Sequence, residues 1–250
     1  MRPEPGPRVV LVHGFTQTAR SWSGFERLLA ERVPGVETVA VDLPGHGEAD
    51  VDPRLDLAGS AAHLVDVGGT AVYVGYSMGG RVALHAALAA PDRVRALVLI
   101  GATAGIDDPD ERAVRRTADE QLAARIEQIG VEAFLGEWLR NPLFAGLSAE
   151  AADLDDRLRN TGAGLAASLR STGTGTQQPL WDRLDEIAVP VLVLAGEHDA
   201  KFRALGERLV AGIPSATFVV VPDAGHTVHL EQPAATADIM ADWLDVASGV

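Results

Sequence analysis

The stretch GYSMG, residues 75–79, decides the fold of this chain. It follows a short β-branched run at residues 71–74 and precedes a run with helical spacing of apolar residues at 78–90. In the pattern G-x-S-x-G, glycines let the chain turn where a Cβ would clash, and the serine is exposed at the carboxyl end of a strand. A turn of small residues without chemistry is the plainer interpretation of this motif taken alone. The rest of the sequence favours Ser77 as a reactive group.

Outward from this motif, short β-branched runs alternate with helical stretches. Because the expected strands show little polar alternation, both of their faces should be buried. Such alternation predicts an α/β fold with a mostly parallel central sheet flanked by helices. Strands are expected at residues 8–12, 36–41, 71–74, 94–100, 189–194 and 217–221, and helices at 21–32, 55–67, 78–90, 203–211 and 233–247.

One segment interrupts this alternation. Residues 103–178 contain helical stretches separated by Gly, Pro and Ser, without a convincing strand. The stretch GTGT at 173–176 has the composition of a flexible return. We therefore expect a helical cap at residues 103–178, inserted into a core made of residues 1–102 and 179–250.

Composition restricts the classes of function. The chain has no cysteine, which rules out disulfides, thiolate zinc sites and a cysteine nucleophile. Its formal net charge is −14, which argues against nucleic acid or an anionic membrane as a partner. Any site for an anionic substrate must therefore contain local arginines, since Lys201 is the only lysine among the 21 basic residues.

Neither a targeting segment nor a cofactor motif is evident. The first residues lack the apolar core of a signal peptide, and no apolar run approaches the roughly 20 residues that cross a bilayer. A cytoplasmic protein is the expectation, and the sequence does not indicate its oligomeric state. The histidines show neither H-E-x-x-H nor another ligand spacing, and no G-x-G-x-x-G or P-loop precedes a suitable helix. We therefore expect neither a metal nor a cofactor.

A serine hydroxyl needs a histidine to take its proton, and that histidine needs a carboxylate to fix its tautomer. His226 comes just after the last expected strand, and His229 is its local competitor. Asp199 follows the strand at 189–194 closely, with Glu197 and Asp223 as nearby alternatives. The expected triad is Ser77, Asp199 and His226.

The oxyanion hole is expected from two backbone N–H groups. The stretch HGF at residues 13–15 follows the first expected strand. We expect the N–H of Phe15 and that of Met78 to point at negative charge developing on a substrate oxygen. The loop DLPGHG, residues 42–47, should pack beside this segment in a structural role.

Taken together, HGF, DLPGHG, GYSMGG, GEHD and AGH resemble the motifs of the α/β-hydrolase superfamily over nearly the whole chain. The order Ser77, Asp199, His226 along the chain is also that of this superfamily. A narrower resemblance lies in HGFTQTARSW, GYSMGGRVALHAAL, STGTGTQQPLW, GEHDAKF and AGHTVHLEQP. These stretches are similar to those of the 2-succinyl-6-hydroxy-2,4-cyclohexadiene-1-carboxylate synthases of menaquinone biosynthesis, the MenH family.

The resemblance implies an α/β-hydrolase fold that performs an elimination, as a lyase, rather than a hydrolysis. This family removes a proton from the carbon beside a succinyl carbonyl of 2-succinyl-5-enolpyruvyl-6-hydroxy-3-cyclohexene-1-carboxylate and expels pyruvate. By the same resemblance, Ser77 deprotonated by His226 would be the base. The oxyanion hole would hold an enolate-like oxygen, and no acyl-enzyme would form.

The resemblance also implies which residues bind this substrate, whose three carboxylates make it a small anionic partner. Arginine suits carboxylates because it offers paired hydrogen bonds. Each arginine could instead lie on a solvated helix face, and Arg159 competes with Arg157 for its role. The implied substrate-binding residues are Tyr76, Arg81, Arg115, Trp138 and Arg157.

Other classes of function remain open. A serine carboxylesterase, a carbon–carbon bond hydrolase or a haloperoxidase-like hydrolase would use the same triad through an acyl-enzyme, and a neutral cap pocket would favour it. A non-catalytic ligand receptor on this fold usually lacks a triad member or an oxyanion residue, and none is missing here. Dehalogenase chemistry is disfavoured because its nucleophile is an aspartate, and this chain has Ser77 at that position.

Overall fold

The computed structural model describes residues 6–50 and 56–247. Its strands are β1 (Arg8–Val12), β2 (Glu37–Val41), β3 (Ala71–Tyr76), β4 (Val94–Ile100), β5 (Val191–Gly196) and β6 (Ala216–Val221). Its α-helices are α1 (Ser23–Arg32), α2 (Leu57–Gly68), α3 (Met78–Ala89), α4 (Pro109–Ile129), α5 (Val131–Trp138), α6 (Ala149–Ala152), α7 (Leu154–Arg157), α8 (Gly162–Thr172), α9 (Ala200–Gly212), α10 (Val228–Glu231) and α11 (Pro233–Ala247). Short 3-10 helices are η1 (Ala19–Trp22), η2 (Pro142–Phe144) and η3 (Trp181–Glu186).

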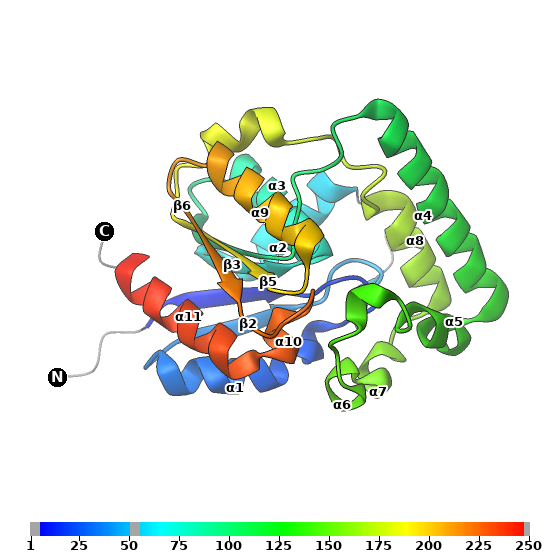
Figure 1. The fold of residues 1–250 in the computed structure, drawn as a ribbon, viewed down its shortest axis with the longest axis horizontal. Coiled ribbons are helices and arrows are strands. Elements are labelled where there is room, and N and C mark those ends of the chain that lie inside the picture. The colour runs from blue at the N-terminus through cyan, green and yellow to red at the C-terminus, as the bar shows by residue number, and fades with distance from the viewer. Residues whose placement is uncertain (1–5, 51–55, 248–250) are drawn as a thin grey trace.

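The described strands form one parallel sheet in the order β2-β1-β3-β4-β5-β6 (Figure 1). Each strand expected from the sequence is present, with its ends shifted by no more than two residues. The central strands β3 and β5 are buried along their whole length, as their unbroken apolar runs predicted. The parallel sheet of the predicted fold class is confirmed.

Helices cover both faces of this sheet. Val10 and Val12 of β1 belong to a core cluster with α2, α3 and α9, whereas Val9 and Leu11 belong to another with α1, α10 and α11. Alternate strand residues point to opposite faces, so the two clusters lie on opposite sides. The helix expected at 55–67 is observed from Leu57, and Leu55 lies outside the described residues. Within the described ranges no helix is both long and apolar enough to cross a membrane.

The segment between β4 and β5 is helical, without a strand among its described residues. Helix α4 packs against α8, and apolar residues of α4, α5 and α8 form a third core cluster. Figure 1 shows α4 to α8, in green, gathered to one side of the sheet. The division of the chain into a core and a cap at residues 103 and 178 stays a prediction.

Candidate active site

Ser77 lies at a sharp turn between β3 and α3. Its φ is 50°, in the left-handed region that residues other than glycine rarely adopt. A Cβ on Gly75 would lie 2.5 Å from the carbonyl oxygen of Gly79, and a Cβ on Gly79 would lie 2.4 Å from that of Val12. The Ser77 N–H donates to the Ile100 carbonyl at 2.8 Å. The strand–turn–helix unit expected from GYSMG is therefore present, with the backbone strain that gathers at functional sites.

Asp199 and His226 form a buried pair at the ends of neighbouring strands. Asp199 follows β5 and caps α9, where its Oδ1 accepts a hydrogen bond from the Phe202 N–H at 3.1 Å. Its Oδ2 lies 2.7 Å from His226 Nδ1. An ionised carboxylate only accepts, so the Nδ1–H donates and Nε2 is left free to take a proton. This is the pairing that a base-assisted serine requires.

The alternatives to this pair lie elsewhere. His229 is fully buried and stacks on Trp22, with ring centroids 4.3 Å apart. Burial, together with the nearby His226, lowers the pKa of His229 to about 3, so it is neutral at physiological pH. Glu197 and Asp223 are exposed and make no hydrogen bond to His226 within the part of the chain that the structure describes. The geometry thus favours the pair expected from the sequence.

Ser77 and His226 line one cavity of about 320 Å³, and the structure brings most of the expected site residues to its wall. The cavity lies between the carboxyl ends of the strands and the helices of segment 103–178. Asp199 is behind His226, and Arg157 does not line the cavity. The expected residues that do line it are Phe15, Tyr76, Ser77, Met78, Arg81, Arg115, Trp138 and His226.

Two backbone N–H groups at this cavity lack a partner. Neither the N–H of Phe15 nor that of Met78 donates a hydrogen bond to any described residue. Met78 is the first residue of α3, where helix geometry leaves the N–H groups unpaired and the helix dipole favours negative charge. The two groups are therefore available to a ligand oxygen, and their role as an oxyanion hole stays a prediction.

The cavity is lined by cations and by no carboxylate among the described residues. The cations are Arg81 on α3, Arg115 on α4 and Lys201 on α9. Arg81 donates to the Thr172 carbonyl at 2.6 Å, and burial together with the charge of Arg115 lowers the pKa of Arg81 to about 10. Arg115 is paired with Asp119 at 2.8 Å. In a chain of net charge −14, this local excess of positive charge fits an anionic ligand.

Aromatic side chains complete the wall. The Trp138 ring packs edge-on against that of Phe15, with centroids 5.3 Å apart. The ring of Phe202 lies 4.4 Å from that of His226. Tyr76 is buried, with its ring centroid 5.3 Å from that of His226. Burial raises the pKa of the Tyr76 hydroxyl, which therefore stays protonated and can donate a hydrogen bond. The wall is therefore aromatic over part of its area and cationic at Arg81, Arg115 and Lys201.

Arg157 is placed away from this wall, although the resemblance implied that it binds substrate. Its guanidinium is buried, with Nε donating to the Ala152 carbonyl at 2.6 Å and Nη1 donating to Thr16 Oγ1. It borders a second cavity outside the active site. The cause is the packing of α7 against the loop at residues 14–18, which turns this side chain toward that loop.

Three side chains of the site were missed by the sequence analysis. Lys201 and its neighbour Phe202 belong to the quoted stretch GEHDAKF, so a signal existed for both. Glu231 was overlooked within AGHTVHLEQP. Its carboxylate accepts from the N–H of Gly225 at 2.7 Å, the N–H of Thr227 at 2.9 Å and Thr227 Oγ1 at 2.7 Å. Glu231 thereby holds the backbone on both sides of His226.

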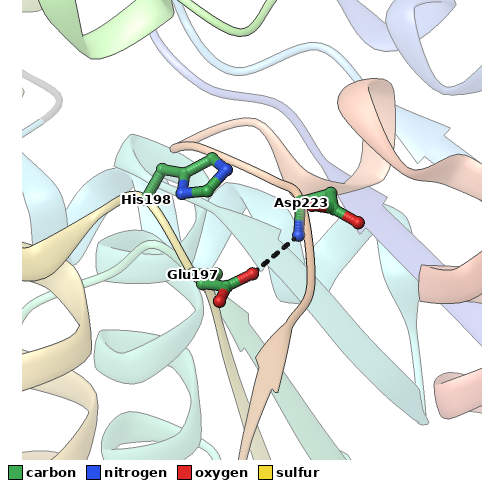
Figure 2. A group of neighbouring side chains, drawn as sticks. All are labelled: Glu197, His198 and Asp223. Carbon is green, nitrogen blue, oxygen red and sulfur yellow. Dashed lines mark hydrogen bonds between the residues drawn. The ribbon is translucent and has the colours of Figure 1, made fainter.

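One group of side chains has the composition of a metal site. Glu197, His198 and Asp223 lie at the ends of β5 and β6, with potential ligand atoms within 4.8 Å of one another (Figure 2). All three are exposed, and a Glu197 oxygen already accepts a hydrogen bond from the Asp223 N–H at 3.1 Å. Asp223 has a φ of 53°, as expected of a residue that shapes the turn before His226. We assign no metal to this group, whose contact joins two adjacent strand ends.

Comparisons with known proteins agree with this geometry. The model of the alpha/beta hydrolase family matches residues 9–239. A protein of Bacillus subtilis (strain 168), provisionally named 2-succinyl-6-hydroxy-2,4-cyclohexadiene-1-carboxylate synthase, is 38% identical over 97% of this chain and 92% of its own. The structure of MenH from S. aureus superposes with a TM-score of 0.91 at 28% identity, covering 99% of this chain and 96% of that one.

An esterase is also similar in structure. The thermophilic esterase from Thermogutta terrifontis, with malate bound, superposes with a TM-score of 0.78 at 27% identity, covering 97% of this chain and 91% of that one. The fold class predicted from the sequence is confirmed by these matches. The chain belongs to the alpha/beta hydrolase family, and within it to the group of 2-succinyl-6-hydroxy-2,4-cyclohexadiene-1-carboxylate synthases.

Proposed function

We propose that this chain is a carbon–oxygen lyase that eliminates pyruvate from 2-succinyl-5-enolpyruvyl-6-hydroxy-3-cyclohexene-1-carboxylate. The observation that carries the proposal is the cavity beside Ser77, with three cations (Arg81, Arg115 and Lys201) and no described carboxylate on its wall. The substrate has three carboxylates, which guanidinium and ammonium groups bind through charge-assisted hydrogen bonds. A small neutral ester would gain nothing from these charges.

In the proposed reaction, Ser77 is the base. His226 Nε2 takes the serine proton while Asp199 stabilises the imidazolium, and the serine oxygen removes the proton at C2, beside the succinyl carbonyl. The electron pair of the broken C–H bond forms C2=C3, the ring double bond moves from C3=C4 to C4=C5, and the C5–O bond breaks. The leaving group is the enolate of pyruvate, which becomes pyruvate by taking up the proton that His226 Nε2 holds. Ser77 then carries the former C2 proton, and His226 is neutral again.

The oxyanion hole has its own part in this step. As the C2 proton leaves, negative charge develops on the succinyl carbonyl oxygen, and the unpaired N–H groups of Phe15 and Met78 stabilise it. Arg81 and Arg115 hold carboxylates, and Trp138 and Tyr76 contact the ring. We propose that the enzyme acts in the cytoplasm, because a trianionic substrate does not cross a bilayer unaided and must be made and used on the same side.

The test is direct. The purified chain is incubated with the enolpyruvyl substrate while pyruvate and the conjugated diene are measured, and intact mass is followed during turnover. We expect stoichiometric pyruvate and diene, with the protein mass unchanged. Ser77→Ala should abolish both products, whereas Ser23→Ala, at an exposed serine of α1, should not. A trapped acyl adduct from a preferred ester, with no pyruvate from the enolpyruvyl compound, would refute the lyase.

The second candidate is a serine carboxylesterase or a related hydrolase working through an acyl-enzyme. The similarity to the esterase from Thermogutta terrifontis favours it, because the pairing of Asp199 with His226 suits acylation of Ser77 equally well. The two candidates differ in the atom that the Ser77 oxygen bonds: a proton in the lyase, and the substrate carbonyl carbon in the hydrolase. The hydrolase predicts a burst of product and a mass increase on the enzyme, and the lyase predicts neither.

A further inference from the structure

We propose that Arg157 and Asn160 are positioning residues that hold the oxyanion loop, defined as residues 14–18, in its active conformation. The inference deepens the proposed function and rests on it, because Phe15 in this loop supplies one oxyanion N–H. Arg157 ends α7 and Asn160 follows it, so both side chains come from the helical segment 103–178. The resemblance alone implied a different role for Arg157, as a ligand of the substrate.

The oxyanion loop is strained and needs support from outside. Thr16 follows Phe15 directly and has a φ of 70°, a value that is an outlier for a β-branched residue. Such a conformation persists only where the surrounding structure makes it the best available one. Thr16 is fully buried, so water does not supply the hydrogen bonds of its polar atoms. Those bonds come from the segment at residues 156–160.

The contacts reach the loop at three points. Arg157 Nη1 donates to Thr16 Oγ1, and Asn160 Nδ2 donates to the Thr16 carbonyl at 2.8 Å. Asp156 Oδ1 accepts from Thr18 Oγ1 at 2.5 Å. Each of these side chains is at most 6% exposed. Both polar groups that Thr16 offers as acceptors are therefore bound by neighbours from the same short segment.

The segment at residues 156–160 also holds the loop at residues 42–47, which lies beside the oxyanion loop. Asn160 Oδ1 accepts from the Gly47 N–H at 3.0 Å, so one amide group joins Thr16 to the loop at residues 42–47. Close by, a Cβ on Gly164 would lie 2.3 Å from the Gly45 carbonyl oxygen, which shows how closely the two backbones approach. A shift of the segment would therefore move the Phe15 N–H with it.

A residue that positions the oxyanion loop and one that binds a substrate carboxylate have different kinetic signatures. Losing a carboxylate ligand raises KM for the anionic substrate, whereas misplacing an oxyanion N–H lowers kcat, because the N–H acts mainly in the transition state. Arg157 makes its hydrogen bonds to Thr16 and Ala152 and does not line the cavity. We therefore expect its loss to appear in kcat.

The experiment compares Arg157→Gln, Asn160→Ala and Thr16→Val with Arg170→Gln. Arg170 is an exposed arginine of α8, in the same helical segment 103–178, and pairs with Glu120 and Glu127 rather than with the oxyanion loop. For each variant, kcat and KM for pyruvate release, the Kd of the diene product and the melting temperature are measured. We expect kcat to fall about tenfold or more in the first three, with KM and Kd within about twofold, because removal of one oxyanion donor costs up to about 10³-fold. Arg170→Gln should resemble the wild type.

A double-variant cycle adds a test that a general loss of stability would not pass. Combining Arg157→Gln with Thr16→Val should lower kcat by much less than the product of the two single losses, because both substitutions remove the same hydrogen bond, between Arg157 and Thr16 Oγ1. If Arg157→Gln does not fold, Thr16→Val, which keeps the side-chain shape, tests the same contact. A raised KM with normal kcat, or normal kcat in folded variants, would overturn the assignment.

Failure of the proposed function looks different. If the wild-type chain releases no pyruvate, the lyase proposal is wrong, and the same variants are then measured with p-nitrophenyl acetate. A parallel loss of kcat on that ester supports the positioning role, because its tetrahedral intermediate uses the same N–H groups. Unchanged ester kcat in the folded variants contradicts it.

Discussion

The two walls of the cavity are built in different ways. The wall at the sheet edge consists of strand ends and tight turns held by backbone hydrogen bonds, such as those from the Gly79 N–H to the His13 carbonyl and from the Gly101 N–H to the Leu194 carbonyl. The helical wall, from segment 103–178, consists of side chains on α4, α5 and α8 that pack on one another in their own cluster.

This difference separates chemistry from recognition. Backbone hydrogen bonds between parallel strands fix the reactive groups in three dimensions, which an activated serine requires. The helices carry exposed ion pairs, such as Arg125 with Glu137 and Arg170 with Glu120, each of which contributes only about 0–1 kcal/mol. Their position therefore depends on apolar packing and on the buried contacts to the oxyanion loop. We expect loss of a reactive group on the sheet-edge wall to lower kcat, and loss of a cation that lines the cavity to raise KM.

The largest effect is expected at the sheet-edge wall. Ser77→Ala and His226→Ala should each lower kcat for pyruvate release by roughly 10³-fold or more, because both act in one proton transfer. The double variant should be little worse than either single one. Near-normal turnover by Ser77→Ala in a folded protein, judged by circular dichroism, would remove this serine from the mechanism.

The cations test the recognition side of the comparison. Arg81→Ala and Arg115→Ala should each raise KM for the trianionic substrate by about tenfold or more, since a charge-assisted hydrogen bond contributes roughly 1.5–3 kcal/mol. A neutral phenyl ester should be unaffected. Arg125→Ala is the matched control, because Arg125 lies on α4 like Arg115 but is paired with Glu137 and does not line the cavity. Equal effects on both substrates would contradict carboxylate binding.

Glu231 should give a smaller effect, confined to kcat. Glu231→Gln keeps one carboxamide oxygen as an acceptor but replaces the other oxygen by an NH₂ group. Either the Gly225 N–H or the Thr227 N–H then loses its acceptor, and the His226 side chain is held less firmly. We expect kcat to fall several-fold with little change in KM, because the loss of a hydrogen bond to a charged group weakens the hold on this loop by about 1.5–3 kcal/mol. Glu197→Gln, at the exposed acceptor nearby, should be silent. An equal response of the two variants would argue against a specific role for Glu231.

The smallest effect concerns stability and distinguishes the two neighbouring histidines. The folded-state pKa of His229 is lowered to about 3, so between that value and its ordinary value near 6.5 the unfolded chain binds one more proton. Stability should therefore fall as the pH falls through this window. His229→Phe keeps a ring against Trp22 and should reduce the slope by up to about 1.4 kcal/mol per pH unit. Urea unfolding at pH 7, 6 and 5 measures it, and parallel curves for wild type and variant would contradict it.

Local patterns predicted the sheet-edge wall well because its geometry follows from local rules. The G-x-S-x-G turn after a buried strand leaves the serine exposed at the end of that strand. Residues that follow parallel strands meet at one edge of the sheet. Strand positions therefore placed His226 and Asp199 at this edge, where the structure pairs them by a hydrogen bond. Their catalytic role stays a prediction. Glu231 was missed because its function is to bind backbone N–H groups, for which its residue type alone carries no signal.

The helical wall was harder to predict, and Arg157 shows why. The family resemblance implied that Arg157 binds substrate. Whether a helical side chain points into a cavity or toward a neighbouring loop depends, however, on how that helix packs. Lys201 was visible in GEHDAKF, yet only the position of α9 beside the cavity made it a wall residue.

The sequence by itself determined the order of Ser77, Asp199 and His226 along the chain and the acidic net charge of −14. It also predicted the sharp turn at Ser77. Tertiary structure alone decided which cations reach that cavity and which residues support the oxyanion loop. The physical reason is the separation along the chain of the residues that interact. Strand ends and glycine turns are set by neighbours in the chain, whereas Arg157 and Thr16 are 141 residues apart and meet only through packing.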